Sequence, residues 1–184
     1  FIEHFDSAGT AFGLRLKRKL ESVRTDYQHI EMWDTETFGY LMTIDGATML
    51  TTRDNFLYHE MMAHPALFSH AAPRNVLIIG GGDCGTLREV LRHGEVASAV
   101  QIDIDEQVTR FSEKYFPELC ESNGDERAEL RVEEGVKFMH GGHLATLFSA
   151  RNYFRQQKND SALLLIAKDS QGTLRVRAKR LEHQ

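Results

Sequence analysis

The sequence predicts an α/β protein in which a small N-terminal antiparallel β domain precedes a domain built on a parallel sheet. Short alternating runs fill residues 1–52, helical spacing begins directly afterwards, and strand-like and helix-like segments then alternate. We therefore divide the 184 residues into a β domain at 1–52 and a larger domain at 53–184. This length suits one domain with a small appendage.

The first part of the chain has strand-like alternation. Apolar and polar residues alternate loosely in "SVRTDYQHIEMWDT". The run "FGYLMTIDGATMLTT" predicts two strands joined at Asp45-Gly46, a dipeptide typical of tight hairpins. Residues 1–52 are thus expected to form a small antiparallel sheet.

A helix is predicted next, because apolar residues recur at helical spacing from Asp54 to Phe68. Asp54 can cap the helix, since its carboxylate can accept from the N–H groups of the first turn. Pro65 removes a backbone donor and is expected to kink the helix late.

Strands and helices then alternate along the chain. "RNVLIIG", "ASAVQIDID" and "AELRVEEG" predict strands, and "TLREVLRHG" and "EQVTRFSEKYF" predict the helices between them. Gly94 is expected to stop the first of these helices in a left-handed conformation, and Pro117 follows the second. This order implies a parallel sheet with right-handed crossovers.

Composition excludes several classes of function. The formal net charge of −5 argues against general affinity for nucleic acid. No stretch approaches the ~20 apolar residues that span a bilayer, and no secretion signal is visible. Cys84 and Cys120 are too few for a disulfide framework and belong to no zinc-spaced cluster, so we expect a cytoplasmic protein without a metal.

A glycine-rich turn separates the first strand of the alternating region from its helix. Gly80, Gly82 and Gly85 fit G-x-G-x-x-G, in the strand-to-helix context that the motif requires. Asp103 ends the next strand, about 20 residues on, where a carboxylate can hold both ribose hydroxyls. The pattern indicates a Rossmann-like nucleoside or dinucleotide site. The alternative is a glycine-rich connection with Asp103 as a helix cap.

The carboxylate of Asp83 lies inside this turn. A pyrophosphate would meet its negative charge at close range, which is unfavourable in a dry site, whereas a cation would be attracted. Asp83 therefore favours a sulfonium nucleoside of the S-adenosylmethionine type over NAD. It also favours a ligand tail that has an amine and no carboxylate.

Four segments together closely resemble the spermidine synthase family, the polyamine aminopropyltransferases. They are "YHEMMAHPAL", "VLIIGGGDCGTLREVL", "DIDEQV" and "KYFPEL", and the resemblance covers roughly residues 20–139. It implies a small β domain followed by an S-adenosylmethionine methyltransferase-like Rossmann domain. It also implies transfer of the aminopropyl group of decarboxylated S-adenosylmethionine to putrescine, giving spermidine and methylthioadenosine, with no metal or cofactor. The family is usually dimeric, so the resemblance implies a homodimer.

The resemblance also implies roles for individual residues. Gln28 matches a glutamine at the aminopropyl end of the nucleoside, and Tyr58 and His59 match residues where the acceptor amine meets the donor. Asp83 matches the carboxylate that binds the donor's amine. The positions that match the nucleoside site are Gly80, Gly81, Gly82, Gly85, Asp103 and Glu134, of which Glu134 stands where the family usually has an aspartate. Without the family, Tyr58 and His59 could face the core or an interface, and Gln28 could be an ordinary exposed residue.

One element of the family pattern is missing from the sequence. The D-S-[ST]-D-P loop that follows the fourth strand and carries the proton acceptor is not found, and little room exists for it between Phe138 and His143. "GGHLATLFSA" and "SALLLIAKD" are interpreted as strands. Either the sequence omits residues around 139–143, or the protein is a deletion product that binds a nucleoside without catalysis. No catalytic residue is therefore assigned.

Two other functions stay open. The first is a methyltransferase that uses intact S-adenosylmethionine, which Asp83 and the Tyr58-His59-Glu60 run disfavour. The second is a catalytically inactive nucleoside-binding homologue that dimerises through its β domain.

Overall fold

A computed structural model describes residues 1–5, 8–133, 162–166 and 175–176. Its contacts divide the chain into two compact units, Phe1–Tyr58 and His59–Gln184. The first unit is antiparallel and the second holds a mostly parallel sheet with helices, so the predicted fold class is confirmed.

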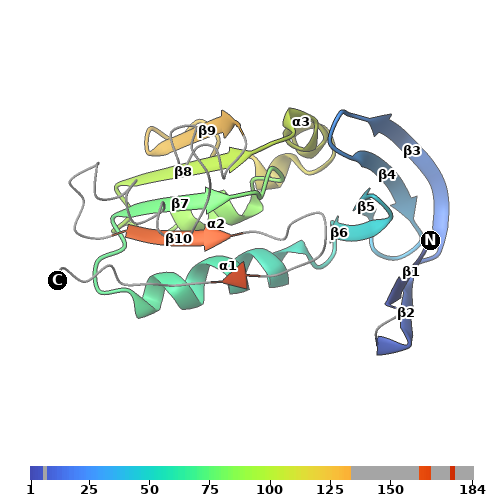
Figure 1. The fold of residues 1–184 in the computed structure, drawn as a ribbon, viewed down its shortest axis with the longest axis horizontal. Helices are drawn as coiled ribbons and strands as arrows, with labels where there is room; N and C mark the ends of the chain where they lie inside the picture. Colours follow the sequence, from blue (N-terminus) through green and yellow to red (C-terminus); the bar gives the residue numbers. More distant parts are fainter. Residues whose placement is uncertain (6–7, 134–161, 167–174, 177–184) are drawn as a thin grey trace. The chain divides into compact units, whose positions relative to one another are not determined.

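The first unit contains two small antiparallel sheets (Figure 1). One pairs β1 with β2, and the other has the order β3-β4-β5-β6. The predicted hairpin at Asp45-Gly46 is confirmed, because both residues have positive φ, 50° and 80°, as a tight hairpin turn needs. The strands are β1 Ile2–Phe5, β2 Thr10–Gly13, β3 Leu16–Arg24, β4 His29–Thr35, β5 Tyr40–Ile44 and β6 Ala47–Thr51.

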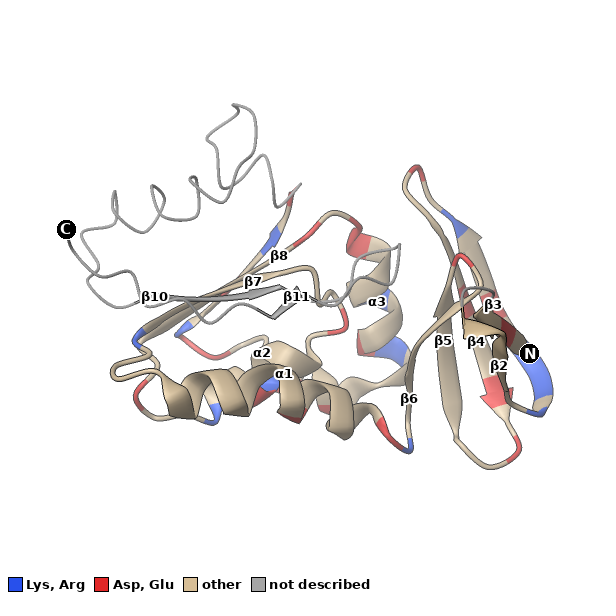
Figure 2. Ribbon diagram, turned by 60° about the horizontal axis from the view of Figure 1, so that its bottom comes forward, with Lys and Arg blue, Asp and Glu red and all other residues tan. Residues whose placement is uncertain are grey.

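The four-stranded sheet buries apolar residues and carries charges of both signs (Figure 2). Ile30 and Met32, two residues apart on β4, are fully buried, as the period of a strand requires. Lys17 on β3 lies 3.3 Å from Asp34 on β4. Such exposed ion pairs contribute little stability, so the buried residues hold this sheet together.

Helix α1 spans Asn55–Ser69 and confirms the predicted helix. It continues through Pro65, so the expected kink does not end it, and the Ser69 hydroxyl donates to the Pro65 carbonyl at 2.6 Å. Asp54 does not cap α1 as expected, because its carboxylate accepts a hydrogen bond from the Thr51 hydroxyl.

The second unit is a sheet with the order β11-β10-β7-β8-β9, whose strands β10, β7, β8 and β9 lie side by side in Figure 1. All neighbouring pairs from β10 to β9 are parallel, and β11 is antiparallel to β10. The predicted order of strand, helix, strand, helix, strand is confirmed. The elements are β7 Asn75–Ile79, α2 Gly85–Leu91, β8 Ser98–Asp103, α3 Glu106–Tyr115, a 3-10 turn η2 Pro117–Leu119, β9 Ala128–Val132, β10 Ala162–Ile166 and β11 Arg175–Val176.

Strand β10 lies beside β7 in the parallel sheet. It confirms "SALLLIAKD" as a strand, and its register pairs Ala162 with Asn75 and Ile166 with Ile79. The edge of β7 therefore has a backbone partner, which a buried parallel strand needs. The other expected strand, "GGHLATLFSA", lies outside the described residues.

Helices α1 and α2 share one hydrophobic core with the parallel strands. Its members are Ala63, Ala66 and Leu67 of α1, Val76 and Ile78 of β7, Leu87, Val90 and Leu91 of α2, and Val96 and Ala99 at β8. This core fixes the loop between β7 and α2, which holds the glycine turn.

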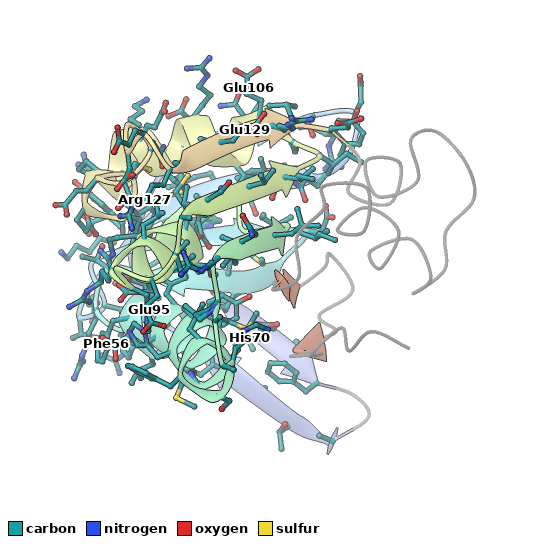
Figure 3. All side chains as sticks on the ribbon, turned by 90° about the vertical axis from the view of Figure 1, so that its left-hand side faces the viewer. Phe56, His70, Glu95, Glu106, Arg127 and Glu129 are labelled. Carbon is teal, nitrogen blue, oxygen red and sulfur yellow. The ribbon has the colours of Figure 1, made fainter. Side chains whose placement is uncertain are left out.

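The end of α2 differs from its prediction. The helix ends at Leu91 with Arg92 in the right-handed region, and Gly94 does not have the expected positive φ. The guanidinium of Arg127 (labelled in Figure 3) donates to the carbonyls of Leu91, at 2.7 Å, and Val96, at 3.2 Å. A distant arginine thus satisfies carbonyls at this helix end, so a left-handed glycine is not needed.

Candidate functional site

The glycine turn joins β7 to α2 by a sharply bent backbone. Gly80 and Gly81 have φ values of 79° and 76°, a region that residues with a Cβ rarely adopt. Cys84 also has a positive φ of 67° and is fully buried. The Gly80 N–H donates to the Ile102 carbonyl of β8 at 2.7 Å. Two of the predicted glycines are therefore required by backbone conformation.

Gly82 and Gly85 are required for a different reason, because other side chains occupy the space where their Cβ would lie. A Cβ on Gly82 would lie 2.9 Å from the Asp103 carboxyl carbon. A Cβ on Gly85 would overlap the imidazole ring of His59. A missing side chain in such a turn lets a ligand lie against the backbone, but in this structure it also makes room for His59 and Asp103.

The Asp83 carboxylate is held from one side. Its Oδ1 lies 3.2 Å from Nε2 of His59 and accepts the Gly85 N–H at 2.9 Å. Its side chain is 13 % exposed, whereas His59 is fully buried. Burial raises the pKa of Asp83, but the His59 ring, the Gly85 N–H and the Arg88 guanidinium outweigh it, so the pKa lies below its usual value. Asp83 is consequently ionised at neutral pH.

Asp103 lies at the carboxyl end of β8 and anchors the glycine turn. Its Oδ2 accepts the Gly82 N–H at 2.8 Å, and its Oδ1 accepts the Asp105 N–H at 3.0 Å. Burial raises the pKa of Asp103 above its usual value, and the negative charges of Asp83 and Asp105 add to this. The cap of α3 is Asp105, which accepts the Gln107 N–H, so the helix-cap alternative applies to Asp105.

A pocket of about 240 Å³ is lined by Asp103 together with residues of α3 and β9. Arg110 and Arg131 contribute positive charge and Glu106 and Glu113 contribute negative charge to its lining. Because charges of both signs line the pocket, the lining favours neither an anionic nor a cationic ligand. Asp103 thus lines this pocket and also supports the glycine turn.

Three further residues support the turn. The Gln101 amide donates to the Cys84 sulfur at 3.6 Å, and the Thr109 hydroxyl donates to the Gly82 carbonyl at 2.8 Å. Arg88 on α2 contributes positive charge near Asp83. Gln101 could have been found, because a glutamine inside the apolar run "ASAVQID" needs a buried partner.

The structure brings together the predicted residues of the second unit, namely His59, the glycine turn with Asp83, and Asp103. Gln28 and Tyr58 belong to the first unit. Gln28 lies just before β4, where its N–H donates to the Thr25 hydroxyl at 3.1 Å. Glu134 lies outside the described residues.

The described part of the chain contains neither a metal-binding cluster nor a membrane-spanning helix. Within it, no group of three or more His, Cys, Asp or Glu residues is arranged to hold a metal ion. None of the helices described there is both long and apolar enough to cross a membrane.

The fold and the turn define a class of protein: a Rossmann-like nucleoside-binding domain that follows a small β domain. Two family models match the chain. The spermine/spermidine synthase domain matches residues 55–143, and the spermidine synthase tetramerisation domain matches residues 1–52. The chain belongs to the spermidine synthase family.

Curated relatives agree with this assignment. The polyamine aminopropyltransferase of Xanthomonas campestris pv. campestris (strain B100) is 64 % identical over 139 residues, which are 76 % of this chain and 49 % of that protein. The polyamine aminopropyltransferase of Thioalkalivibrio sulfidiphilus (strain HL-EbGR7) is 65 % identical over 130 residues, which are 71 % of this chain and 46 % of that protein. The chain thus spans about half the length of the curated relatives that it matches.

Solved structures show the same similarity. Spermidine synthase from Thermotoga maritima has a TM-score of 0.72 and 35 % identity, over 77 % of this chain and 50 % of that one. A spermidine synthase in complex with the transition-state analogue AdoDATO has a TM-score of 0.76 and 30 % identity, over 92 % of this chain and 53 % of that one.

Proposed function

We propose that the protein transfers the aminopropyl group of decarboxylated S-adenosylmethionine to putrescine, giving spermidine and methylthioadenosine. The observation that carries this proposal is the ionised, largely buried carboxylate of Asp83 inside the glycine turn. A cationic amine of the donor would neutralise this charge, whereas the carboxylate of intact S-adenosylmethionine would be repelled by it.

The reaction is a direct displacement at carbon. The sulfonium makes its neighbouring methylene electrophilic and leaves as a neutral thioether. The attacking amine must first lose a proton to a base, and correct placement of amine and donor supplies much of the remaining rate. The D-S-[ST]-D-P loop that holds this base in the family is not found in the sequence, so no residue is assigned as the proton acceptor.

The remaining roles are proposals that rest on family resemblance. Gln28, Tyr58 and His59 would act at the amine end of the donor, and Asp103 and Glu134 would bind its ribose and adenine. Residues 1–52 would form the β domain and 53–184 the catalytic domain. Neither a metal nor a bound cofactor is required by this chemistry.

We also propose a homo-oligomer in the cytoplasm. The match of residues 1–52 to a domain described as a tetramerisation domain supports self-association. A dimer is the form implied by the family resemblance, and a tetramer is the form implied by that description. The low cysteine content supports a reducing compartment.

A second candidate function is an inactive homologue that binds a nucleoside. It is favoured by one observation, the absence of the aspartate-rich loop from the sequence. A methyltransferase is disfavoured, because the carboxylate of intact S-adenosylmethionine would face Asp83.

Product analysis by mass spectrometry separates the three functions. The protein is incubated with putrescine and either decarboxylated or intact S-adenosylmethionine. Spermidine and methylthioadenosine from the decarboxylated donor alone are expected, and Asp83→Asn is expected to reduce the preference for this donor about tenfold, the effect of losing one charge-assisted contact. Methylated product would support the methyltransferase, and donor binding without any product would support the inactive homologue.

A further inference from the structure

We propose that Cys84 and Cys120 are a redox-sensitive pair, which a small disulfide such as oxidised glutathione converts into an intramolecular disulfide that weakens ligand binding at the glycine turn. The bond would join the centre of this turn to the segment after η2. Formation of the bond is independent of the proposed function, whereas its effect on the donor rests on that function and concerns the regulation of the same site.

The two cysteines lie on segments that are already held together. Cys84 is the residue before α2 and is fully buried, with a positive φ of 67°. Cys120 follows η2, where its N–H donates to the Pro117 carbonyl at 3.0 Å, and it is partly exposed. The Arg88 guanidinium on α2 donates to the Glu118 carbonyl in η2 at 3.0 Å. The glycine turn and η2 are therefore neighbours, although they are far apart in sequence.

The side chains of the two cysteines contact each other directly. The Cys120 thiol donates a hydrogen bond to the Cys84 sulfur. The side-chain amides of Gln101, at 3.6 Å, and Asn123 donate to the same sulfur. The hydrogen bond from Cys120, together with those from the two amides, lowers the pKa of Cys84 below its usual value, although burial and the charge of Asp83 oppose this. The same contact raises the pKa of Cys120, so the two thiols titrate as one pair.

The surroundings of Cys84 are polar, unlike those of a cysteine that only fills space. Oε1 of Gln101 and Oδ1 of Asn123 are buried and have no hydrogen-bond partner among the described residues. An unpaired buried oxygen is costly, and here it accompanies two amide groups that donate to one sulfur. This arrangement stabilises a thiolate, which is the reactive form of cysteine.

Exchange begins at Cys120, because Cys84 has no exposed surface. The pair first loses one proton to water, and the proton that remains lies on Cys84 while the Cys120 thiolate attacks a glutathione sulfur. A bond forms between these two sulfurs, the S–S bond of glutathione breaks, and one glutathione thiolate leaves and takes the proton of Cys84. The Cys84 thiolate then attacks the Cys120 sulfur and displaces the second glutathione thiolate, which takes a proton from water. Two protein thiols are oxidised, one glutathione disulfide is reduced, and no proton is released overall.

The disulfide is expected to change the glycine turn. A disulfide bond is about 2.05 Å long, much shorter than a hydrogen-bond contact between sulfurs, so the Cys84 sulfur must move towards Cys120. The Cys84 thiol donates to the Gly82 carbonyl at 3.5 Å, and oxidation removes this donor. Cys84 directly follows Asp83, so a shift of its backbone moves the carboxylate that is proposed to bind the donor. In a reducing compartment the pair stays reduced until oxidised glutathione accumulates.

Counting free thiols tests the pair without any ligand. The full chain is reduced, equilibrated with mixtures of reduced and oxidised glutathione, alkylated under denaturing conditions and weighed intact by mass spectrometry. The sequence contains two cysteines, so an intramolecular disulfide is recognised by the loss of both alkylation sites, without added glutathione, in a chain that runs as a monomer on a non-reducing denaturing gel. We expect this product in the wild type, and its reversal by dithiothreitol. Cys120→Ser is the matched control and should keep Cys84 open to alkylation.

Isothermal titration calorimetry tests the effect of the disulfide on the site. Oxidised wild type should bind decarboxylated S-adenosylmethionine about tenfold more weakly than the reduced protein, the effect of losing one charge-assisted contact. Dithiothreitol should restore the affinity. Cys120→Ser should have the affinity of the reduced wild type both with and without oxidised glutathione. Circular dichroism confirms that the oxidised form is folded.

Other results overturn the proposal. If both thiols of the wild type stay open to alkylation, or only glutathione adducts and crosslinked chains form, the two cysteines are not a redox-sensitive pair. If the disulfide forms and donor binding is unchanged, the bond does not regulate the site. If Cys120→Ser does not fold, Cys120→Ala takes its place, and weakening of this variant by oxidised glutathione would show that the effect does not come from the disulfide. A reduced wild type that does not bind the donor refutes the proposed function and the regulatory effect, whereas the mass measurement alone decides whether the disulfide forms.

Discussion

At the scale of single residues, the glycine turn contains glycines of two kinds. Gly80 and Gly81 adopt positive φ, whereas Gly82 and Gly85 leave space for Asp103 and His59. The first kind depends on local backbone, and the second on residues far away in sequence. The stability lost by a substitution at Gly85 should therefore be partly restored by shortening the side chain of His59. A loss caused by positive φ could not be restored in this way.

We predict that Gly85→Ala destabilises the protein by about 1–3 kcal/mol, the usual cost of overpacking, because its Cβ would overlap the His59 ring. In the double variant with His59→Ala, the loss should be smaller than the sum of the two single losses. Urea unfolding of the four proteins measures this coupling.

Gly94→Ala is the control for this experiment, because a Cβ there meets nothing within 4 Å and the residue lacks positive φ. It should change stability by about 0.5 kcal/mol or less, as surface substitutions usually do. Strictly additive losses for Gly85→Ala and His59→Ala would contradict the assigned contact.

At the scale of elements, two histidines of α1 face carboxylates of the segment that follows β7. His59 faces Asp83 of the glycine turn, and His64 faces Glu89, which joins α1 to α2. Glu89 is completely buried and also contacts Arg88 and Arg92, at 2.9 and 2.8 Å. A buried carboxylate is tolerated only with such partners, so this cluster fixes which helix faces meet.

The Glu89 cluster predicts a pH dependence of stability. Burial raises the pKa of Glu89, but Arg92 and Arg88 outweigh it, so the folded pKa lies below the usual 4.5. A depressed carboxyl pKa stabilises the fold above the unfolded pKa, and this contribution is lost as pH falls through the folded pKa. The stability difference between wild type and Glu89→Gln should thus shrink below pH 4.5 in urea unfolding.

Glu113→Gln provides the comparison for Glu89, because Glu113 is 45 % exposed and lies 3.6 Å from Arg110 on the surface of α3. Its effect should be small at every pH. A Glu89→Gln variant that behaves like Glu113→Gln would show that the buried cluster does not favour ionised Glu89.

The contacts of Arg127 at the C-terminal end of α2 lead to a second prediction, which concerns the stability of the fold. Arg127 donates to the carbonyls of Leu91 and Val96 and is held by Asp125, whose pKa it lowers to about 2. Arg127→Ala would leave these carbonyls without their donor and should cost about 1–3 kcal/mol in urea unfolding. Arg110→Ala removes exposed ion pairs with Glu106 and Glu113 and should cost at most about 1 kcal/mol. Equal losses would mean that Arg127 does not cap α2.

At the scale of the whole molecule, the features that could be predicted from the sequence are those set by short-range patterns. The strand and helix order, the Asp45-Gly46 hairpin and the glycine turn each depend on residues close in sequence. Gly82 and Gly85 were predicted from the motif, but the side chains that fill the space of their missing Cβ atoms were not, since Asp103 is 21 residues from Gly82. The end of α2 likewise depends on Arg127, 36 residues beyond Leu91.

Residues of the candidate site could be proposed from the sequence, but the contacts between them could not. Asp83 and Asp103 were found from motif and spacing, whereas the burial of His59 follows from packing of α1 on α2, which periodicity does not specify. The pairing of β10 with β7 could not be predicted from the sequence either, because it depends on which strand edge is available in the folded sheet.

The first unit exposes apolar residues on its smallest sheet. Phe5 and Phe12 of the β1–β2 hairpin lie on one face and are 42 and 40 % exposed, whereas Ile2, 63 % exposed, lies on the other face. An isolated two-stranded hairpin is marginally stable, so one that exposes aromatic residues is expected to be covered by another surface. The match of residues 1–52 to a tetramerisation domain makes a second copy of the chain the expected cover.

We therefore predict that Phe12→Glu shifts the protein from the proposed oligomer towards the single chain, because the new charge would be buried in the contact. Size-exclusion chromatography with light scattering measures the mass at a fixed protein concentration. His4→Glu adds the same charge to the same hairpin, but His4 pairs with Ala11 and lies on the opposite face from Phe12, whose partner is Glu3. His4→Glu should leave the mass unchanged. If both variants keep the wild-type mass, subunits associate through another surface of the protein, and the exposed aromatic residues of the hairpin need a different explanation.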